Sequence, residues 1–304
     1  MLTVTFLGTG AATPTLDRNV SSLAVHREGE MLLFDCGEGT QRQMMRYGVG
    51  FTFREVFFTH YHADHLLGIT GLLRTMGLQD RTEPVTLYGP KGARQVLGAA
   101  VALGVERNKF PVNIVEVRAG DRLKRDGYDL VVFATEHRVD TVGFALAEHT
   151  RLGRFNPERA RELGIPEGAF WGRLHRGERV VLDDGRTIDP SELVGPARHG
   201  RTLVYSGDTR PCSTLLEAAR GADLLIHEAT FSTEDESRAK ETGHSTAAEA
   251  ARVALEAGVR RLVLTHISPR YNRDAPELLA EARAVFPEVA IARDGFTVDV
   301  PFPD

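Results

Sequence analysis

Residues 56–68, with the sequence VFFTHYHADHLLG, lead an apolar run directly into four polar groups that resist burial. These groups are His60, His62, Asp64 and His65, and a buried imidazole or carboxylate needs a partner that offsets its desolvation. Both side-chain types are ligands suited to zinc and similar divalent ions. Four donors are too many for one tetrahedral metal that also keeps a position open for water, so the motif indicates two metals.

Three further candidate ligands follow apolar runs elsewhere in the chain: His137 after VVFATE, Asp208 after LVYSG and His266 after LVLT. Taken singly, each is typical of a hydrogen-bonded structural residue. Taken with the HYHADH motif, they complete a set from which a two-metal site can be built, including the bridging carboxylate that such a site usually has. We therefore expect these strand ends to meet at one place.

Short segments rich in β-branched and aromatic residues alternate with segments of helical spacing, which indicates a layered α/β domain. We predict strands at residues 2–8, 21–27, 31–37, 54–60, 85–90, 129–137, 141–147, 202–208, 223–231, 261–268 and 289–300. We predict helices at residues 63–78, 92–104, 213–221, 245–258 and 276–286.

Two pairs of segments resemble each other across the chain, residues 54–60 with 260–266 and residues 32–40 with 202–210. The similarity is either chance, which is common among apolar strands, or the trace of a duplicated β-rich half. A duplication would bring the ends of equivalent strands to one site.

Residues 151–200 depart from this alternation, with several prolines and glycines and the only tryptophan of the chain. Between 151 and 179 the segment has seven arginines against four glutamates, a surplus of three. Long insertions in compact domains are often either functional or disordered, so a solvated surface excursion and a binding element both remain open.

Composition limits the partners and the compartment. A formal net charge of −5 argues against a protein that coats nucleic acid through bulk positive charge. Only Cys36 and Cys212 are present, so no disulfide framework is expected and a reducing compartment is the simplest interpretation. The first residues lack the pattern of a signal peptide, and no apolar run approaches the ~18 residues of a spanning helix. We expect a cytoplasmic enzyme without membrane contact.

The HYHADH motif together with His137, Asp208 and His266 resembles the metallo-β-lactamase superfamily. A narrower resemblance, over nearly the whole chain, is to the ribonuclease Z family of tRNA 3′-processing endonucleases. It rests on the segments FLGTGAATPTLDRNVSSLAV, LLFDCGEGTQRQMM, LYGPKG, YSGDTRPC, LLIHEATF, GHSTAAEAA and LTHISPRY. The HYHADH motif alone is shared with thioesterases and lactamases, whereas the segments containing DTRPC, HEAT and HST are much more specific.

This resemblance implies an α/β fold, a metallo-β-lactamase-like four-layer αββα sandwich that forms one catalytic domain over residues 1–304. Within it, residues 151–200 would form an inserted tRNA-binding arm. The implied activity is that of a zinc-dependent endoribonuclease, in homodimeric form, that cleaves the 3′ trailer from precursor tRNA by two-metal phosphodiester hydrolysis. The products would be a 3′-hydroxyl on the tRNA and a 5′-phosphate on the trailer. The alternative is a phosphodiesterase or thioesterase of the same fold that acts on a small molecule.

The family pattern also implies how the candidate ligands divide. It places one zinc on His60, His62 and His137, the other on Asp64, His65 and His266, with Asp208 bridging the two. It further assigns to Asp64 the orientation of the attacking water and the acceptance of its proton.

The oxygen that leaves the phosphorus needs a proton, and His244 with Glu228 offers one. Thr246 and Glu249 form a candidate capping box, which would fix His244 at the entry of a helix. A hydrogen bond from Glu228 would hold the imidazole of His244 protonated, as a general acid. The alternative is a structural capping histidine near a solvated glutamate.

Arg18 and Asn19 are candidates for contacts with the RNA backbone, in a loop that the resemblance places beside the active site. The family's Pro-x-Lys-x-Arg-Asn pattern is kept only in part, because Leu16 stands at the lysine position. In the arm, Gly168 and Ala169 stand where the family has a Gly-Pro pair.

Overall fold

The computed structural model describes residues 1–105, 108–271 and 274–303, which divide into two compact units. The first, the core unit, comprises Met1–Ala147 and Arg201–Pro301. The second, the arm unit, comprises Glu148–Gly200 and the residues from Phe302 on. Among the described residues, no helix combines the length and the apolar composition that crossing a membrane requires.

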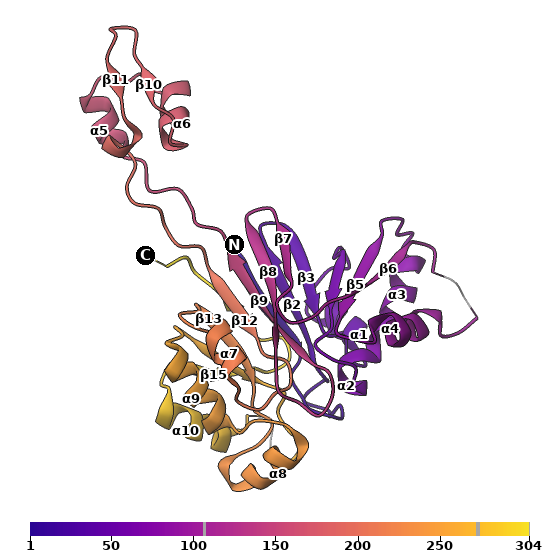
Figure 1. Ribbon diagram of the computed structural model, residues 1–304. Helices are drawn as coiled ribbons and strands as arrows, with labels where there is room; N and C mark the ends of the chain where they lie inside the picture. The colour runs from indigo at the N-terminus through magenta and orange to yellow at the C-terminus, as the bar shows by residue number, and fades with distance from the viewer. Residues whose placement is uncertain (106–107, 272–273, 304) are drawn as a thin grey trace. The chain divides into compact units, whose positions relative to one another are not determined.

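Two sheets form the middle of the core unit, each with seven strands in the described part of the chain (Figure 1). The first sheet has the order β16 (Thr297–Asp299), β1 (Leu2–Gly8), β2 (Ser22–Arg27), β3 (Glu30–Phe34), β4 (Glu55–Phe57), β5 (Val85–Gly89), β6 (Val112–Glu116). The second has the order β15 (Val289–Ile291), β14 (Leu262–Thr265), β13 (Leu224–Glu228), β12 (Thr202–Tyr205), β9 (Val142–Glu148), β8 (Tyr128–Ala134), β7 (Arg122–Arg125).

The two sheets repeat the same order of pairing. In the first, β2 pairs antiparallel with β3, after which β3, β4, β5 and β6 run parallel. In the second, β9 pairs antiparallel with β12, after which β12, β13, β14 and β15 run parallel. The similarity between residues 32–40 and 202–210 therefore joins equivalent strands, β3 and β12. The similarity between 54–60 and 260–266 does not, because β13, rather than β14, is the equivalent of β4.

Three apolar clusters hold the core unit together as four layers. Between the sheets, the rings of Phe34 and Phe57 from the first sheet stack at 5.2 Å, and Phe144 of the second sheet lies 5.6 Å from Phe34. Helices α1 (Thr40–Arg46), α3 (Gly68–Leu78) and α4 (Ala93–Ala102) cover the first sheet. Helices α7 (Ser213–Ala218), α9 (Ala247–Ala257) and α10 (Pro276–Val285) cover the second. The predicted αββα sandwich is confirmed.

The helix predicted at residues 63–78 is divided at Leu67 into α2 (Ala63–Leu66) and α3. The division coincides with a close approach of Gly68 to the loop after β3. The N–H of Gly68 donates to the carbonyl of Cys36 at 2.9 Å, and a Cβ on Gly68 would lie 2.1 Å from the carbonyl oxygen of Gly37. Only glycine fits this contact, which holds α2 against the end of β3.

The arm unit has a small apolar core of its own. It contains α5 (Pro157–Glu162), α6 (Ala169–His175), the hairpin of β10 (Val180–Val181) and β11 (Thr187–Ile188), and the short helix η1 (Pro190–Glu192). Asn156 caps α5 by accepting a hydrogen bond from the N–H of Arg159. The buried side chains that join these elements are Ala160, Ile165, Leu174, Val180, Leu182, Ile188 and Leu193.

The arginines of the arm unit are largely balanced by acids. Six of them form ion pairs, namely Arg159–Glu162, Arg161–Glu167, Arg173–Glu178, Arg176–Glu178, Arg179–Asp189 and Arg186–Asp184. Over residues 151–200, nine arginines stand against five glutamates and three aspartates. The surplus of three counted between 151 and 179 therefore falls to one over the whole segment, and the arm is less basic than its first half indicates.

Candidate active site

The structure brings all seven predicted metal ligands together at one edge of the two sheets. They follow the carboxyl ends of β4, β8, β12 and β14, or lie in α2. Their ligand atoms form two groups, each within 4.8 Å: His60, His62, His137 and Asp208 in one, and Asp64, His65 and His266 in the other.

The carboxylate of Asp208 lies between the two groups. Its Oδ2 is 3.6 Å from Nε2 of His60, 3.4 Å from Nε2 of His65 and 3.4 Å from Nε2 of His266. Two ligands on a tetrahedral metal with bonds near 2.1 Å are separated by about 3.4 Å, so these distances fit atoms that share a metal. Asp208 is 2% exposed, and its position suits a carboxylate that bridges two ions.

Asp35, which no local sequence pattern indicates, fixes the ring of His65 through Nδ1. Its Oδ2 is 2.9 Å from Nδ1 of His65 and accepts from the hydroxyl of Tyr205 at 2.8 Å, while Oδ1 accepts from the N–H of Thr59 at 2.8 Å. Asp35 is fully buried with φ of 54° directly after β3. The ring of His65 therefore presents Nε2 to the metal centre, the arrangement that orients metal-binding histidines.

Three other imidazoles are oriented in the same way. Nδ1 contacts an oxygen in each: Thr59 Oγ1 at 3.0 Å for His60, the Gly243 carbonyl at 2.7 Å for His137, and Thr230 Oγ1 at 2.9 Å for His266. Nε2 of each ring is thereby left to face the centre. His62 instead presents Nδ1, which lies 3.0 Å from Nε2 of His60 and 3.3 Å from Nε2 of His137.

The buried histidines and aspartates of the cluster shift one another's pKa values. Burial, with repulsion from His65, holds the pKa of His60 well below its usual value. Burial alone would raise the pKa of Asp208, but the charges on His266 and His65 outweigh it and lower that pKa well below its usual range. Metal binding requires neutral imidazoles and ionised carboxylates, so divalent ions would supply the positive charge beside Asp208 that protons on the histidines otherwise provide.

A second pair of titratable groups, His244 and Glu228, stands beside the ligands. Nδ1 of His244 is 2.9 Å from Oε1 of Glu228, a buried carboxylate that also accepts from the N–H of Thr209 at 3.0 Å. Burial acts to lower the pKa of His244, but the charge and hydrogen bond of Glu228, with Asp208, raise it to about 9. The capping box predicted for Thr246 with Glu249 is confirmed.

These groups open on a cavity of about 430 Å³. Asp64, His244 and His266 line it from the side of the ligands. The lining also includes Arg238 and Arg270, which are exposed, and Phe231, which is buried. Such a cavity can accept an anionic ester with attached bases.

The structure corrects the expectation that Arg18 contacts RNA. Arg18 is 4% exposed, and its Nη1 donates to Thr9 Oγ1 at 2.7 Å and to the Ala292 carbonyl at 2.7 Å. Its guanidinium therefore ties the loop that contains Arg18 to Thr9 and to the backbone of Ala292. The amide of Asn19 is partly exposed and donates to the Glu38 carbonyl at 2.8 Å, so its contact with RNA stays a prediction.

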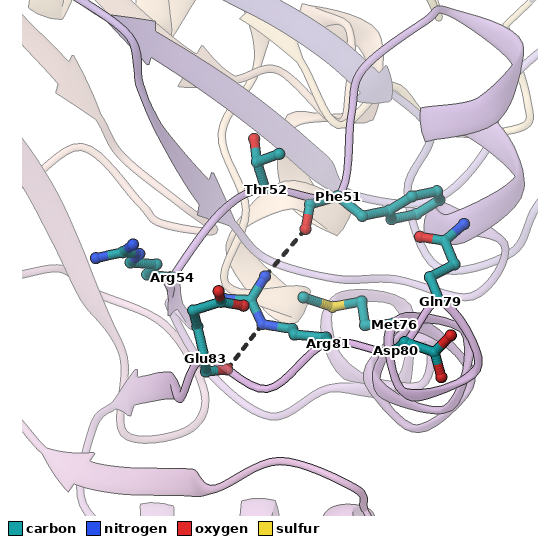
Figure 2. Close-up of a pocket in the computed structure, with 8 residues that line it drawn as sticks. All are labelled: Phe51, Thr52, Arg54, Met76, Gln79, Asp80, Arg81 and Glu83. Carbon is teal, nitrogen blue, oxygen red and sulfur yellow. Dashed lines mark hydrogen bonds between the residues drawn. The ribbon is translucent and has the colours of Figure 1, made fainter.

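A separate cavity of about 410 Å³ shares no residue with the ligand cluster (Figure 2). Arg81 extends into it, with Nε donating to the Glu83 carbonyl at 2.9 Å and Nη1 to the Phe51 carbonyl at 3.1 Å. These bonds use the guanidinium to tie two backbone segments together. The cavity is therefore a feature of loop packing rather than of the active site.

A two-sheet sandwich with histidines and aspartates gathered at its strand ends defines a hydrolase of the metallo-β-lactamase fold, with a side-chain cluster compatible with metal binding. Residues 176–267 match the β-lactamase superfamily domain, and residues 2–151 match the family described as anti-Pycsar protein Apyc1. The chain belongs to the ribonuclease Z family and is an endoribonuclease. It is 60% identical over 301 residues to the ribonuclease Z of Gemmatimonas aurantiaca, covering 98% of this chain and 96% of the relative.

Other relatives agree with this assignment. The ribonuclease Z of Myxococcus xanthus is 56% identical over 305 residues, covering 100% of this chain and 99% of the relative. Among solved structures, the short form of human tRNase Z has a TM-score of 0.71 and 28% identity, with 99% of this chain and 100% of that chain covered. The fold and the family therefore agree over the full length.

Replacing Asp35 by Asn tests the orientation of His65. The amide nitrogen cannot accept the Nδ1–H of His65, so we expect the affinity for metal to fall about 10- to 100-fold. Metal titration of the stripped protein measures the effect without reference to activity. Tyr205→Phe is the matched control, because it removes one donor to Asp35 but leaves the contact with His65. Equal affinity in Asp35→Asn and the natural protein would contradict the role.

Proposed function

We propose that this protein removes the 3′ trailer of precursor tRNA by hydrolysing one phosphodiester bond at a centre that binds two zinc ions. The main support is Asp208 Oδ2, which lies 3.4–3.6 Å from ligand nitrogens of both groups. The relatives named ribonuclease Z, and the human relative named tRNase Z, support tRNA as the substrate.

One metal would be held by His60, His62, His137 and Asp208, the other by Asp64, His65, His266 and Asp208. When bound, the two metals lower the pKa of an attacking water and stabilise the charge that develops on the phosphate oxygens. The protein's own side chains orient the attacking water and transfer protons, through Asp64 and His244.

Asp64 orients the attacking water and accepts its proton. Its Oδ2 receives the N–H of Ala12 at 2.8 Å and lies 3.3 Å from Nε2 of His266. Because the backbone of Ala12 fixes one carboxylate oxygen, the direction of the carboxylate is set before substrate enters. The water oxygen then forms the new bond to phosphorus in line with the bond that breaks.

His244 donates a proton to the departing oxygen. As the bond from phosphorus to the 3′ oxygen breaks, that oxygen takes the proton of His244, and Glu228 stabilises the imidazolium through its contact with Nδ1. The products are a 3′-hydroxyl on the tRNA and a 5′-phosphate on the trailer. The burial of Glu228 argues against the alternative of a solvated glutamate beside a structural histidine.

The arm unit would hold the body of the tRNA by shape and by phosphate contacts. Surface ion pairs contribute little to stability, so phosphates can compete for the arginines that now pair with acids. We further propose, from the family resemblance, a homodimer located in the cytoplasm.

Incubation of the metal-loaded protein with a precursor tRNA and, separately, with bis-p-nitrophenyl phosphate tests the proposed function. We expect cleavage of the RNA at the 3′ side, with a 3′-hydroxyl and a 5′-phosphate at the new ends, and loss of cleavage when a chelator removes the metals. End-group analysis of the two fragments is the readout. Hydrolysis of the small ester with intact precursor tRNA would favour the alternative of a small-molecule phosphodiesterase.

The arm can be removed without leaving a long gap, because the N–H of Gly195 donates to the carbonyl of Arg154 at 2.9 Å. We expect excision of residues 155–194, with two glycines joining the ends, to weaken binding of precursor tRNA at least about 10-fold through the lost phosphate contacts. Hydrolysis of bis-p-nitrophenyl phosphate should stay within about twofold, because the metal centre belongs to the core unit. Equal losses with both substrates would contradict a separate binding role for the arm.

A further inference from the structure

Arg210 joins the loop that carries Asp208 to the loop that carries His244. Its Nη1 donates to the His244 carbonyl at 2.6 Å and to Oε2 of Glu249 at 2.7 Å, while Nη2 pairs with Oε1 of Glu249. The Arg210 side chain is 15% exposed and that of Glu249 is 8% exposed. Charge-assisted bonds of this kind, formed away from water, hold a fixed geometry.

The backbone of Arg210 reaches a third loop, the one that carries His137. The N–H of Arg210 donates to the Glu136 carbonyl at 2.7 Å, and the N–H of Glu136 donates to Thr209 Oγ1 at 2.9 Å. His137 follows directly in the chain. One residue therefore links the loop of the bridging carboxylate, the loop of a zinc ligand and the loop of the proton donor.

Glu249 connects the same group to helix α9. Its Oε2 accepts the N–H of Thr246 at 2.9 Å, and its own N–H donates to Thr246 Oγ1 at 3.2 Å. Ser245 adds a bond from its hydroxyl to the Thr209 carbonyl at 2.6 Å. Two successive residues, His244 and Ser245, thus bond to the Asp208 loop directly, and Thr246 is connected to it through Glu249.

We propose that Arg210 is a positioning residue that sets the place of His244 relative to the scissile phosphate. This inference rests on the proposed role of His244 as proton donor. Glu228 fixes the imidazole through Nδ1, and Arg210 fixes the backbone from which that imidazole extends. The planar guanidinium reaches the carbonyl and both carboxylate oxygens at once, which a lysine ammonium cannot do with the same geometry.

A purely structural role is the competing explanation, since Arg210 and Glu249 also stabilise the start of α9. The two explanations differ in which substrate is affected. A misplaced proton donor slows only reactions whose leaving group needs a proton, whereas a general loss of packing slows every substrate.

The test compares two precursor tRNAs that differ in one atom at the scissile phosphate. In the oxygen-bridged RNA the leaving atom is the natural 3′ oxygen, and in the sulfur-bridged RNA it is a sulfur. A thiolate leaves without a proton, so its departure does not depend on His244. Variants Arg210→Lys and His244→Ala are measured in single-turnover reactions with both RNAs. Arg125→Lys is the matched control, because Arg125 forms a comparable part-buried pair with Glu55, with exposures of 23% and 16%, that joins β7 of the second sheet to β4 of the first.

We expect His244→Ala to slow cleavage of the oxygen-bridged RNA at least about 100-fold and Arg210→Lys at least about 10-fold. With the sulfur-bridged RNA both variants should stay within about threefold of the natural protein, and Arg125→Lys should stay there with both RNAs. Glu249→Gln, which keeps an oxygen for the cap but removes the charge opposite Arg210, should show the same selective loss to a smaller degree.

Each outcome decides the inference. If Arg210→Lys and Glu249→Gln slow both RNAs equally, or slow neither, the positioning role of Arg210 is overturned. A selective loss in His244→Ala would in that case still support His244 as the proton donor. If His244→Ala slows both RNAs equally, His244 is not the proton donor, and the positioning role of Arg210 fails with it. Melting curves on all variants show that the compared proteins are folded.

Discussion

The structure depends on the placement of one buried carboxylate among imidazoles. Asp208 is 2% exposed, and its Oδ2 lies 3.4–3.6 Å from nitrogens of three histidines, two from the HYHADH motif and one from the loop after β14. Such a group is costly to bury unless positive charge surrounds it. The neighbouring ligands, the ring-orienting contacts of Asp35, Thr59 and Thr230, and the loops beyond them are arranged so that two divalent ions can supply that charge.

The two-sheet architecture explains how so many ligands reach one place. Each sheet ends in a run of parallel strands whose carboxyl ends meet at the same edge, so short loops after β4, β12 and β14 deliver side chains to a common centre. The apolar layer between the sheets, with Phe34, Phe57 and Phe144, keeps these edges in register. Arg210 and Glu249 then connect the loop of Asp208 to the loop of His244, the proposed proton donor.

Much of this could be predicted from sequence, because apolar strands that end in histidine or aspartate are a local pattern. The layers, the gathering of the seven candidate ligands and the Thr246–Glu249 cap are all found in the structure. Asp35 was missed because its partners His65 and Tyr205 lie 30 and 170 residues away, so nothing near it indicates a role. Strand β7, with the sequence RLKR, lacks an apolar pattern because it is a partly exposed edge strand. Arg18 was predicted to contact RNA because a loop arginine is usually solvated, whereas this one is buried.

In the proposed mechanism, Asp208 bridges two metals that the reaction requires. The most direct measurement is the zinc content per chain, by mass spectrometry of the purified natural protein and of Asp208→Ala, paired with the cleavage rate of precursor tRNA. We expect about two zinc ions per natural chain, about one or none in the variant, and loss of cleavage in the variant. An Asp208→Ala protein that retains two zinc ions and cleaves precursor tRNA at the natural rate would contradict it.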